Sequence, residues 1–96
     1  MVQQVTIKTS DRARLKPLLR SAIENEKKML LWGLERTRQR LAEFEQRYGL
    51  TSVEFERRLQ ALELKETVEF SEWRMEIEML RLLQSQYQAL QEAELD

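Results

Sequence analysis

The stretch LLWGLERTRQRLAEFEQRYGLTSVEF, residues 30–55, decides the fold. Side chains that can be buried recur in it at alternating intervals of four and three residues, at Leu30, Leu34, Thr37, Leu41, Phe44 and Tyr48. This heptad rhythm is typical of a helix that packs lengthwise against another helix. Gly49 predicts the end of the helix, because glycine readily adopts the left-handed backbone of a helix C-terminus. Thr51 and Glu54 then have the spacing of a capping box, which predicts a new helix.

The first helix is predicted over residues 11–48. Ser10 or Asp11 can cap its start. Pro17 either kinks this helix or lies in its first turn. The residues from Pro17 to Tyr48 alone would be about 48 Å long, whereas a compact domain of this size has a radius of gyration of about 13 Å. The molecule is therefore expected to be elongated.

Two further helices are predicted after the break. A short one covers residues 51–63, and a long one covers residues 68–92 with Thr67 as its cap. The long helix repeats the rhythm of three and four, at Phe70, Trp73, Ile77, Leu80, Tyr87 and Leu90. The predicted fold is all-α and forms one domain over residues 1–96. It is an elongated antiparallel hairpin of a long, a short and a long helix.

Residues 1–9 have a different pattern. Val5 and Ile7 alternate with polar residues, which is typical of a short β-strand. An otherwise helical chain has no second strand for it. This segment would therefore pair with its copy in a dimer, pair with the sheet edge of another protein, or stay loose.

The composition excludes most catalytic chemistry. The chain has no cysteine and no histidine, which removes thiol, imidazole and nearly all zinc and haem chemistry. It has no glycine-rich phosphate loop and no nucleophile elbow. Glu72 and Glu76 share a helix face, but such a pair is far more often solvated than bound to a metal. We therefore expect a protein that is not an enzyme and has no cofactor or metal.

No stretch has the order of residues found in a signal peptide. The longest apolar run, Met29 to Trp32, is far too short to span a bilayer. A soluble cytoplasmic protein without a membrane partner is expected.

Charge is unevenly distributed along the chain. Residues 1–48 carry eleven Lys/Arg against six Asp/Glu, and residues 49–96 carry five against eleven. We interpret this as two long helices with complementary charges. The alternative is a basic face that binds nucleic acid through Arg12, Arg14, Lys16 and Arg20. It is disfavoured, because the net charge of −1 opposes strong phosphate affinity, and is kept only as an additional autoregulatory role.

Met29, Leu31 and Trp32 are surplus to a two-helix hairpin. Neighbouring helix residues lie about 100° apart, so these three point away from the side that Leu30 and Leu34 share. Either a dimer mate or a different protein would cover them. Met75 and Met79 would suit an adaptable surface, although methionine is commoner in a core. The predicted interface residues are Met29, Leu31, Trp32, Val5, Ile7, Met75 and Met79, in a homodimer or higher oligomer, because an elongated small chain buries little surface.

The stretch ERTRQRLAEFEQRYGLTSVEFERRLQALEL, followed by VEFSEWRMEIEMLRLLQ, resembles the small helical antitoxins of the TumA type. The resemblance covers residues 34–90, and its distinctive positions are Leu41, Phe44, Tyr48, Gly49, Thr51, Phe55, Glu72 and Trp73. It implies a protein without catalysis of its own that binds and neutralises a cognate, ribonuclease-like toxin. Such a protein would act by covering the active surface of the toxin. The alternative is a structural coiled-coil or adaptor protein that oligomerises and has no toxin.

Overall fold

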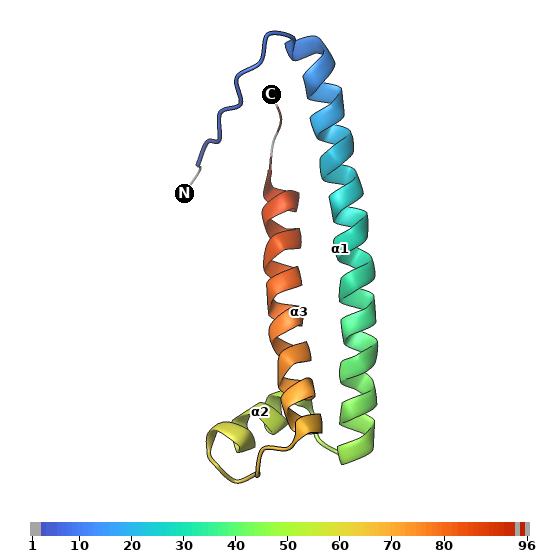
Figure 1. Ribbon diagram of the computed structural model, residues 1–96, viewed down its shortest axis with the longest axis vertical. Coiled ribbons are helices and arrows are strands. Elements are labelled where there is room, and N and C mark those ends of the chain that lie inside the picture. The colour runs from blue at the N-terminus through green and yellow to red at the C-terminus, as the bar shows by residue number, and fades with distance from the viewer. Residues whose placement is uncertain (1–2, 94, 96) are drawn as a thin grey trace.

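The computed structural model describes residues 3–93 and 95. Over these residues the chain forms three helices, α1 (Arg12–Tyr48), α2 (Ser52–Gln60) and α3 (Val68–Glu92). Figure 1 shows α1 and α3 running antiparallel, with α2 at the closed end of the hairpin. The molecule measures 58 × 26 × 19 Å and its radius of gyration is 18.8 Å. The prediction of an elongated, all-helical hairpin is therefore confirmed.

The ends of α1 follow from local chemistry. The carboxylate of Asp11 accepts a hydrogen bond from the backbone N–H of Arg14 at 3.1 Å, which satisfies one of the free donors of the first turn. Pro17 lies inside the helix, which continues past it. At the other end Gly49 has a φ of 65°, and its N–H donates to the carbonyl of Glu45.

α2 ends at Gln60, three residues before the predicted end at residue 63. The chain turns back at Leu62, whose φ is 59°. The N–H of Leu62 donates to the carbonyl of Leu59 and the N–H of Glu63 to that of Arg58, the pair of bonds that defines a Schellman motif. The predicted helix was too long because a Schellman motif usually has glycine at its left-handed position, and this position holds Leu62 instead.

The start of α2 is tied to α1. The hydroxyl of Thr51 accepts from the N–H of Glu54 at 3.1 Å, as the capping-box spacing predicts. The carboxylate of Glu45, near the end of α1, accepts from the N–H of Ser52 at 2.6 Å. Glu54 itself accepts from Arg57 and Arg58. These bonds lower the pKa of Glu54 to about 2.

The main core lies at the closed end, where all three helices meet. Its buried members are Leu41, Phe44, Phe55, Trp73 and Ile77, of which Phe55 and Trp73 are fully buried. The ring of Trp73 stacks on Phe55 with centroids 3.8 Å apart and on Phe44 with centroids 5.5 Å apart. Its indole N–H donates to the hydroxyl of Ser52 at 3.0 Å. Trp73 therefore holds α1, α2 and α3 together.

Farther from the closed end, α1 and α3 pack directly against each other without α2. Leu30 and Leu34 are buried on the side of α1 that faces α3. A Cβ added to Gly33 would lie 3.2 Å from a methyl carbon of Leu83, so the glycine allows a close approach of this side chain. Because α1 has 37 residues and α3 has 25, α1 extends well beyond the end of α3 (Figure 1).

Ion pairs between helices follow the predicted charge asymmetry. Arg40 of α1 lies 3.2 Å from the carboxylate of Glu76 in α3. Arg47 of α1 pairs with Glu69 of α3, which also accepts from the hydroxyl of Tyr48. The basic helix and the acidic helix therefore neutralise part of each other's charge within one chain.

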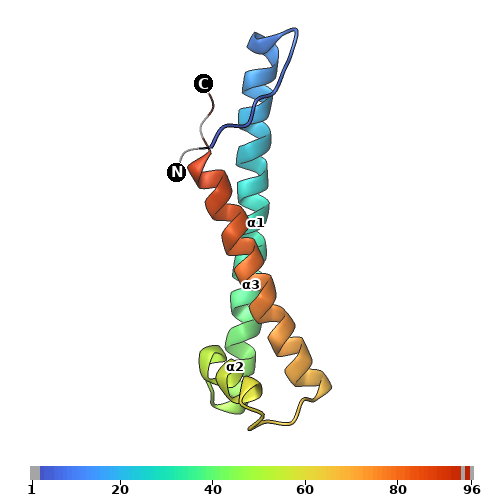
Figure 2. The same ribbon diagram turned by 90° about the vertical axis from the view of Figure 1, so that its left-hand side faces the viewer.

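The predicted strand over residues 1–9 is not present in the described part of this segment. Residues 3–9 have no regular secondary structure, and Val5 is 91% exposed. Residues 1 and 2 lie outside the described residues. The physical reason is that a strand needs a neighbouring strand for its hydrogen bonds, and residues 3–93 form only helices and their connections. Figure 2 shows this segment returning along the upper part of the molecule, apart from the core.

Candidate protein-binding surfaces

Met29 and Trp32 lie on the outer side of α1. Trp32 precedes the buried Leu34 by two positions, which places it about 200° around the helix. Its side chain is 75% exposed, and that of Met29 is 61% exposed. Leu31 is also exposed, but it is about 100° from Trp32 and faces a different direction.

The exposed row on α1 continues toward its N-terminus. Leu18 is exposed, and fourteen residues, close to four helical turns, separate it from Trp32. We define the α1 outer stripe as five residues at spacings of four and three, Leu18, Ala22, Asn25, Met29 and Trp32. All five are exposed.

A second exposed row lies on the outer side of α3. Met75 falls two positions from each of the buried residues Trp73 and Ile77, so it points away from the core. Met75 is 68% exposed, and Met79 is also exposed. We define the α3 outer stripe as Val68, Met75, Met79 and Leu82, all exposed, with Glu72 filling the position between the first two.

Val68, Leu82 and Leu18 were absent from the predicted interface. Each continues a row whose other members, Met75, Met79 and Trp32, were predicted. The signal was present, since the outer rows repeat the spacing of four and three that marks the buried rows. The sequence alone does not say which row of a helix with two apolar rows is buried.

The charges beside the α3 outer stripe are mainly acidic. Glu72 and Glu78 are exposed there. Arg81 donates to the carboxylates of Glu56 and Glu78, and these bonds raise the pKa of Arg81. Arg74 pairs with Glu66 at 2.7 Å. The cations of this region are therefore paired within the chain, while Glu72 leaves negative charge on the stripe.

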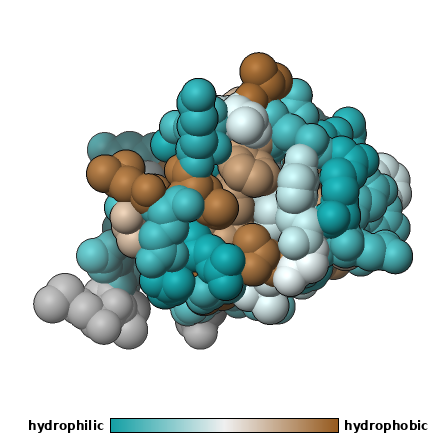
Figure 3. Space-filling view, turned by 90° about the horizontal axis from the view of Figure 1, so that it is seen from below, coloured by the Kyte–Doolittle hydropathy of each residue, from teal (hydrophilic) through white to brown (hydrophobic). Residues whose placement is uncertain are grey.

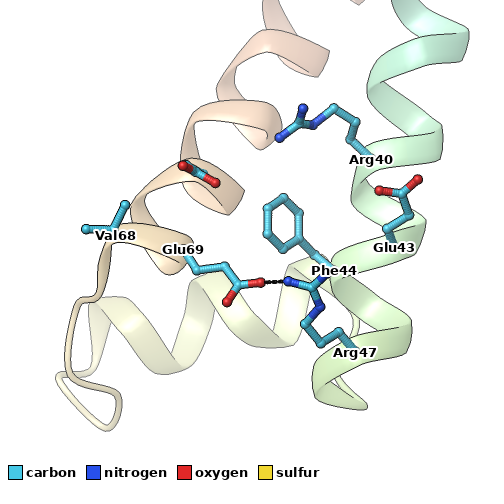
Figure 4. Close-up of a pocket in the computed structure, with 7 residues that line it drawn as sticks. Arg40, Glu43, Phe44, Arg47, Val68 and Glu69 are labelled. Atoms are coloured by element: carbon cyan, nitrogen blue, oxygen red, sulfur yellow. Dashed lines mark hydrogen bonds and ion pairs between the residues drawn. The ribbon is translucent and has the colours of Figure 1, made fainter.

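A cleft of about 470 Å³ lies between α1 and the first turns of α3. Figure 4 shows Phe44 in its interior and Arg40, Glu43, Arg47 and Glu69 around it. Arg47 is bonded to Glu69 across the cleft. Its cations are paired with carboxylates, which makes it a polar surface feature rather than a binding site for an anion. In the part of the chain that the structure describes, no three His, Cys, Asp or Glu side chains are grouped to hold a metal ion.

The four basic residues considered for nucleic acid do not form one surface. Arg12, Lys16 and Arg20 line one shallow groove beside Pro17. Arg14 lies about 200° around the helix from Arg12 and pairs with Asp11 at 3.4 Å. The structure thus brings three of them together and separates the fourth.

Apolar side chains are also exposed at the closed end of the hairpin. Val53 of α2 and Leu62 after it are almost fully exposed. Figure 3, which shows this end, displays hydrophobic residues in separate patches among hydrophilic ones. We regard these as isolated exposed residues, which are common on protein surfaces.

Comparison of the chain with protein-family models, curated proteins and solved structures finds no match. No helix within residues 3–93 combines the length and the apolar character that a bilayer span requires.

Proposed function

We propose that this protein is a non-enzymatic antitoxin that works in the cytoplasm as a homodimer and neutralises a cognate toxin by covering its active surface. The observation that supports it best is the α3 outer stripe. Four apolar side chains stand there in heptad spacing, and all are exposed. An apolar row of this kind is what a helix presents to a groove or to another helix of a partner protein.

The stripe has the size and chemistry of a protein contact. From Val68 to Leu82 it is about 21 Å long, since each residue adds 1.5 Å. Met75 and Met79 adapt to irregular surfaces because their side chains are unbranched and polarisable. Patches of exposed apolar residues on one helix face are also typical of interaction sites.

Charge indicates the type of partner. Residues 49–96 carry five basic and eleven acidic residues, and Glu72 lies within the stripe itself. An enzyme that cleaves RNA must present cationic groups to phosphates. The acidic α3 would be attracted to such a surface and would compete with RNA for it. This agrees with the ribonuclease-like toxin that the resemblance implies.

The N-terminal segment supplies a second contact in this proposal. Val5 and Ile7 are both exposed, and residues 3–9 have no partner strand within the described residues. Their alternating pattern suits a strand that forms on the sheet edge of the toxin. In that case binding would order the segment, and its deletion would weaken the complex.

The test is co-expression with the neighbouring gene of toxin size, followed by co-purification. We expect capture by the wild type and loss of capture when Met75→Glu and Met79→Glu are combined. Gln86→Glu is the matched control, because it adds a charge to the same face of α3 beyond the stripe. A neighbour that never co-purifies, or equal loss in the control, would show the antitoxin proposal to be wrong.

A structural coiled-coil or adaptor protein is the second candidate. The α1 outer stripe favours it, since mostly apolar residues in heptad spacing allow helices to associate. Such a protein would oligomerise normally and would capture no toxin. Replacement of Met75 and Met79 would then leave its cellular role unchanged.

A further inference from the structure

The chain exposes more surface than a compact monomer of its mass. Its accessible area is 8019 Å². A typical folded monomer of 11.6 kDa exposes about 5,800 Å². The excess, about 2,200 Å², is comparable to what one subunit buries in a large permanent interface, where both subunits together bury about 2,000–5,000 Å². Much of α1 is exposed because this helix continues beyond α3.

The α1 outer stripe is arranged symmetrically about Asn25. Ala22 and Met29 lie three and four positions from it, and Leu18 and Trp32 each lie seven positions from it. One half of the stripe therefore carries the smaller side chains, and the other half carries the larger ones. An antiparallel copy of the same helix would bring each half against the other.

We propose that two copies associate through this stripe as antiparallel α1 helices, with the two-fold axis at Asn25. Leu18 then packs against the partner's Trp32, and Ala22 against the partner's Met29, so that small and large side chains alternate across the interface. The two Asn25 side chains meet at the axis, where a polar pair sets the register of associating helices. The inference deepens the homodimer of the proposed function by naming its surface and its geometry.

The parallel arrangement fits less well. It would place Trp32 against the partner's Trp32 and Ala22 against the partner's Ala22. One level would then be crowded and the other would contain a void, and both overpacking and cavities destabilise an interface. Size complementarity therefore selects the antiparallel arrangement.

The charges beside the stripe form both opposite-charge and like-charge pairs in that arrangement. Residues whose numbers add to about 50 face each other across an axis at Asn25. Glu35 then lies near the partner's Arg14, whereas Glu24 lies near the partner's Glu26 and Arg14 also near the partner's Arg36. All of these side chains are exposed, so the pairs contribute little energy of either sign, and the register depends on the side chains of the stripe itself.

The proposed dimer leaves the toxin surface open. The two outer stripes lie on different helices and point away from the core, with Val68 and Glu72 of the α3 outer stripe also bordering the cleft between α1 and α3. The partner's α1 would cover only the α1 outer stripe. Each dimer would therefore present two separate α3 outer stripes.

The geometry can be measured with spin labels, because the chain has no cysteine of its own. Ser21→Cys and Gln39→Cys each place one label beside the helix. In the proposed dimer the two labels of a pair are separated along the helix axis by about 12 Å at position 21 and about 42 Å at position 39. A parallel dimer would give two similar short distances, which would overturn the proposal.

The surface is tested by light scattering on the full chain. The wild type is expected at twice 11.6 kDa, and Trp32→Glu is expected to raise the dissociation constant at least about tenfold. Met79→Glu is the control and should leave the dimer intact, and circular dichroism verifies that both variants remain helical. A monomeric wild type, or a dimer broken by Met79→Glu and not by Trp32→Glu, would overturn the proposal. No toxin is present in these measurements, so their failure is separate from failure of the antitoxin function.

Discussion

Trp73 is the residue on which the closed end of the hairpin depends. It is fully buried, it stacks on rings from α1 and α2, and its N–H has a partner in Ser52. A large aromatic side chain contributes most when its polar atom is also satisfied. Ser52 therefore begins α2 and also accepts the hydrogen bond that keeps the buried indole of Trp73 satisfied.

Ser52→Ala is expected to destabilise the protein by about 1–2 kcal/mol, because it leaves the buried indole N–H without its acceptor. Urea unfolding followed by circular dichroism measures this. Ser85→Ala, an exposed position on α3, is the control and should change the free energy of unfolding little. An equal effect at both positions would show that the bond to Trp73 contributes nothing.

Leu62 carries backbone strain after α2. Its φ of 59° lies in the left-handed region, which costs a residue with a Cβ about 1–2 kcal/mol. Leu62→Gly should therefore stabilise the protein by about 1 kcal/mol, although glycine loses more entropy on folding. Leu62→Ala removes the same exposed side chain but keeps the strain, so it should give no such gain in thermal unfolding.

At the scale of elements, α2 is the one that depends on its neighbours. Nine residues are too few for a helix to be stable alone in water. The helix is held by Phe55 in the core, by Glu45 at its first turn and by the bonds of Glu54 to two arginines. Its stability is therefore determined by contacts that other elements supply.

The pKa of Glu54 predicts a dependence of stability on pH. Arg57 and Arg58 lower this pKa from 4.5 to about 2 in the folded protein. The carboxylate thus stabilises the fold fully above pH 4.5 and loses this contribution as the pH falls through about 2. Glu54→Gln should be less stable than the wild type at pH 7 and approach it near pH 2. The same difference in free energy of unfolding between Glu54→Gln and the wild type at every pH, measured by urea unfolding, would contradict this.

At the scale of the whole molecule, shape and charge act together. The hairpin is 58 Å long and only 19 Å thick, so it has few residues with neighbours on all sides. Arg40–Glu76 and Arg47–Glu69 join the two long helices, but these pairs are partly exposed and add little stability. A chain of this shape would be stabilised most by burying its outer stripes against another protein.

The unfolding temperature should therefore depend on protein concentration. Dimerisation stabilises the folded state by mass action, and a hundredfold rise in concentration corresponds to about 2.7 kcal/mol. We expect differential scanning fluorimetry to show a higher midpoint at higher concentration for the wild type. The midpoint of Trp32→Glu should stay nearly constant. A constant midpoint for both would argue against a dimer.

The sequence by itself determined the features that depend on neighbouring or periodic residues. The spacing from Leu30 to Tyr48 and from Phe70 to Leu90 predicted two long packed helices, and Gly49 and Thr51 predicted the break between them. These signals are local, because helix periodicity and capping involve residues at most a few positions apart.

Only the tertiary structure decided the contacts between distant residues. It showed that Glu45 caps α2, that Ser52 accepts from Trp73 and that Gly33 makes room for Leu83. It also showed that Met75 and Met79 are outside the core and that residues 3–9 form no strand in this chain. Periodicity tells which residues share a side of a helix. Which side is buried depends on where the second helix crosses, and that is settled by packing of the whole chain.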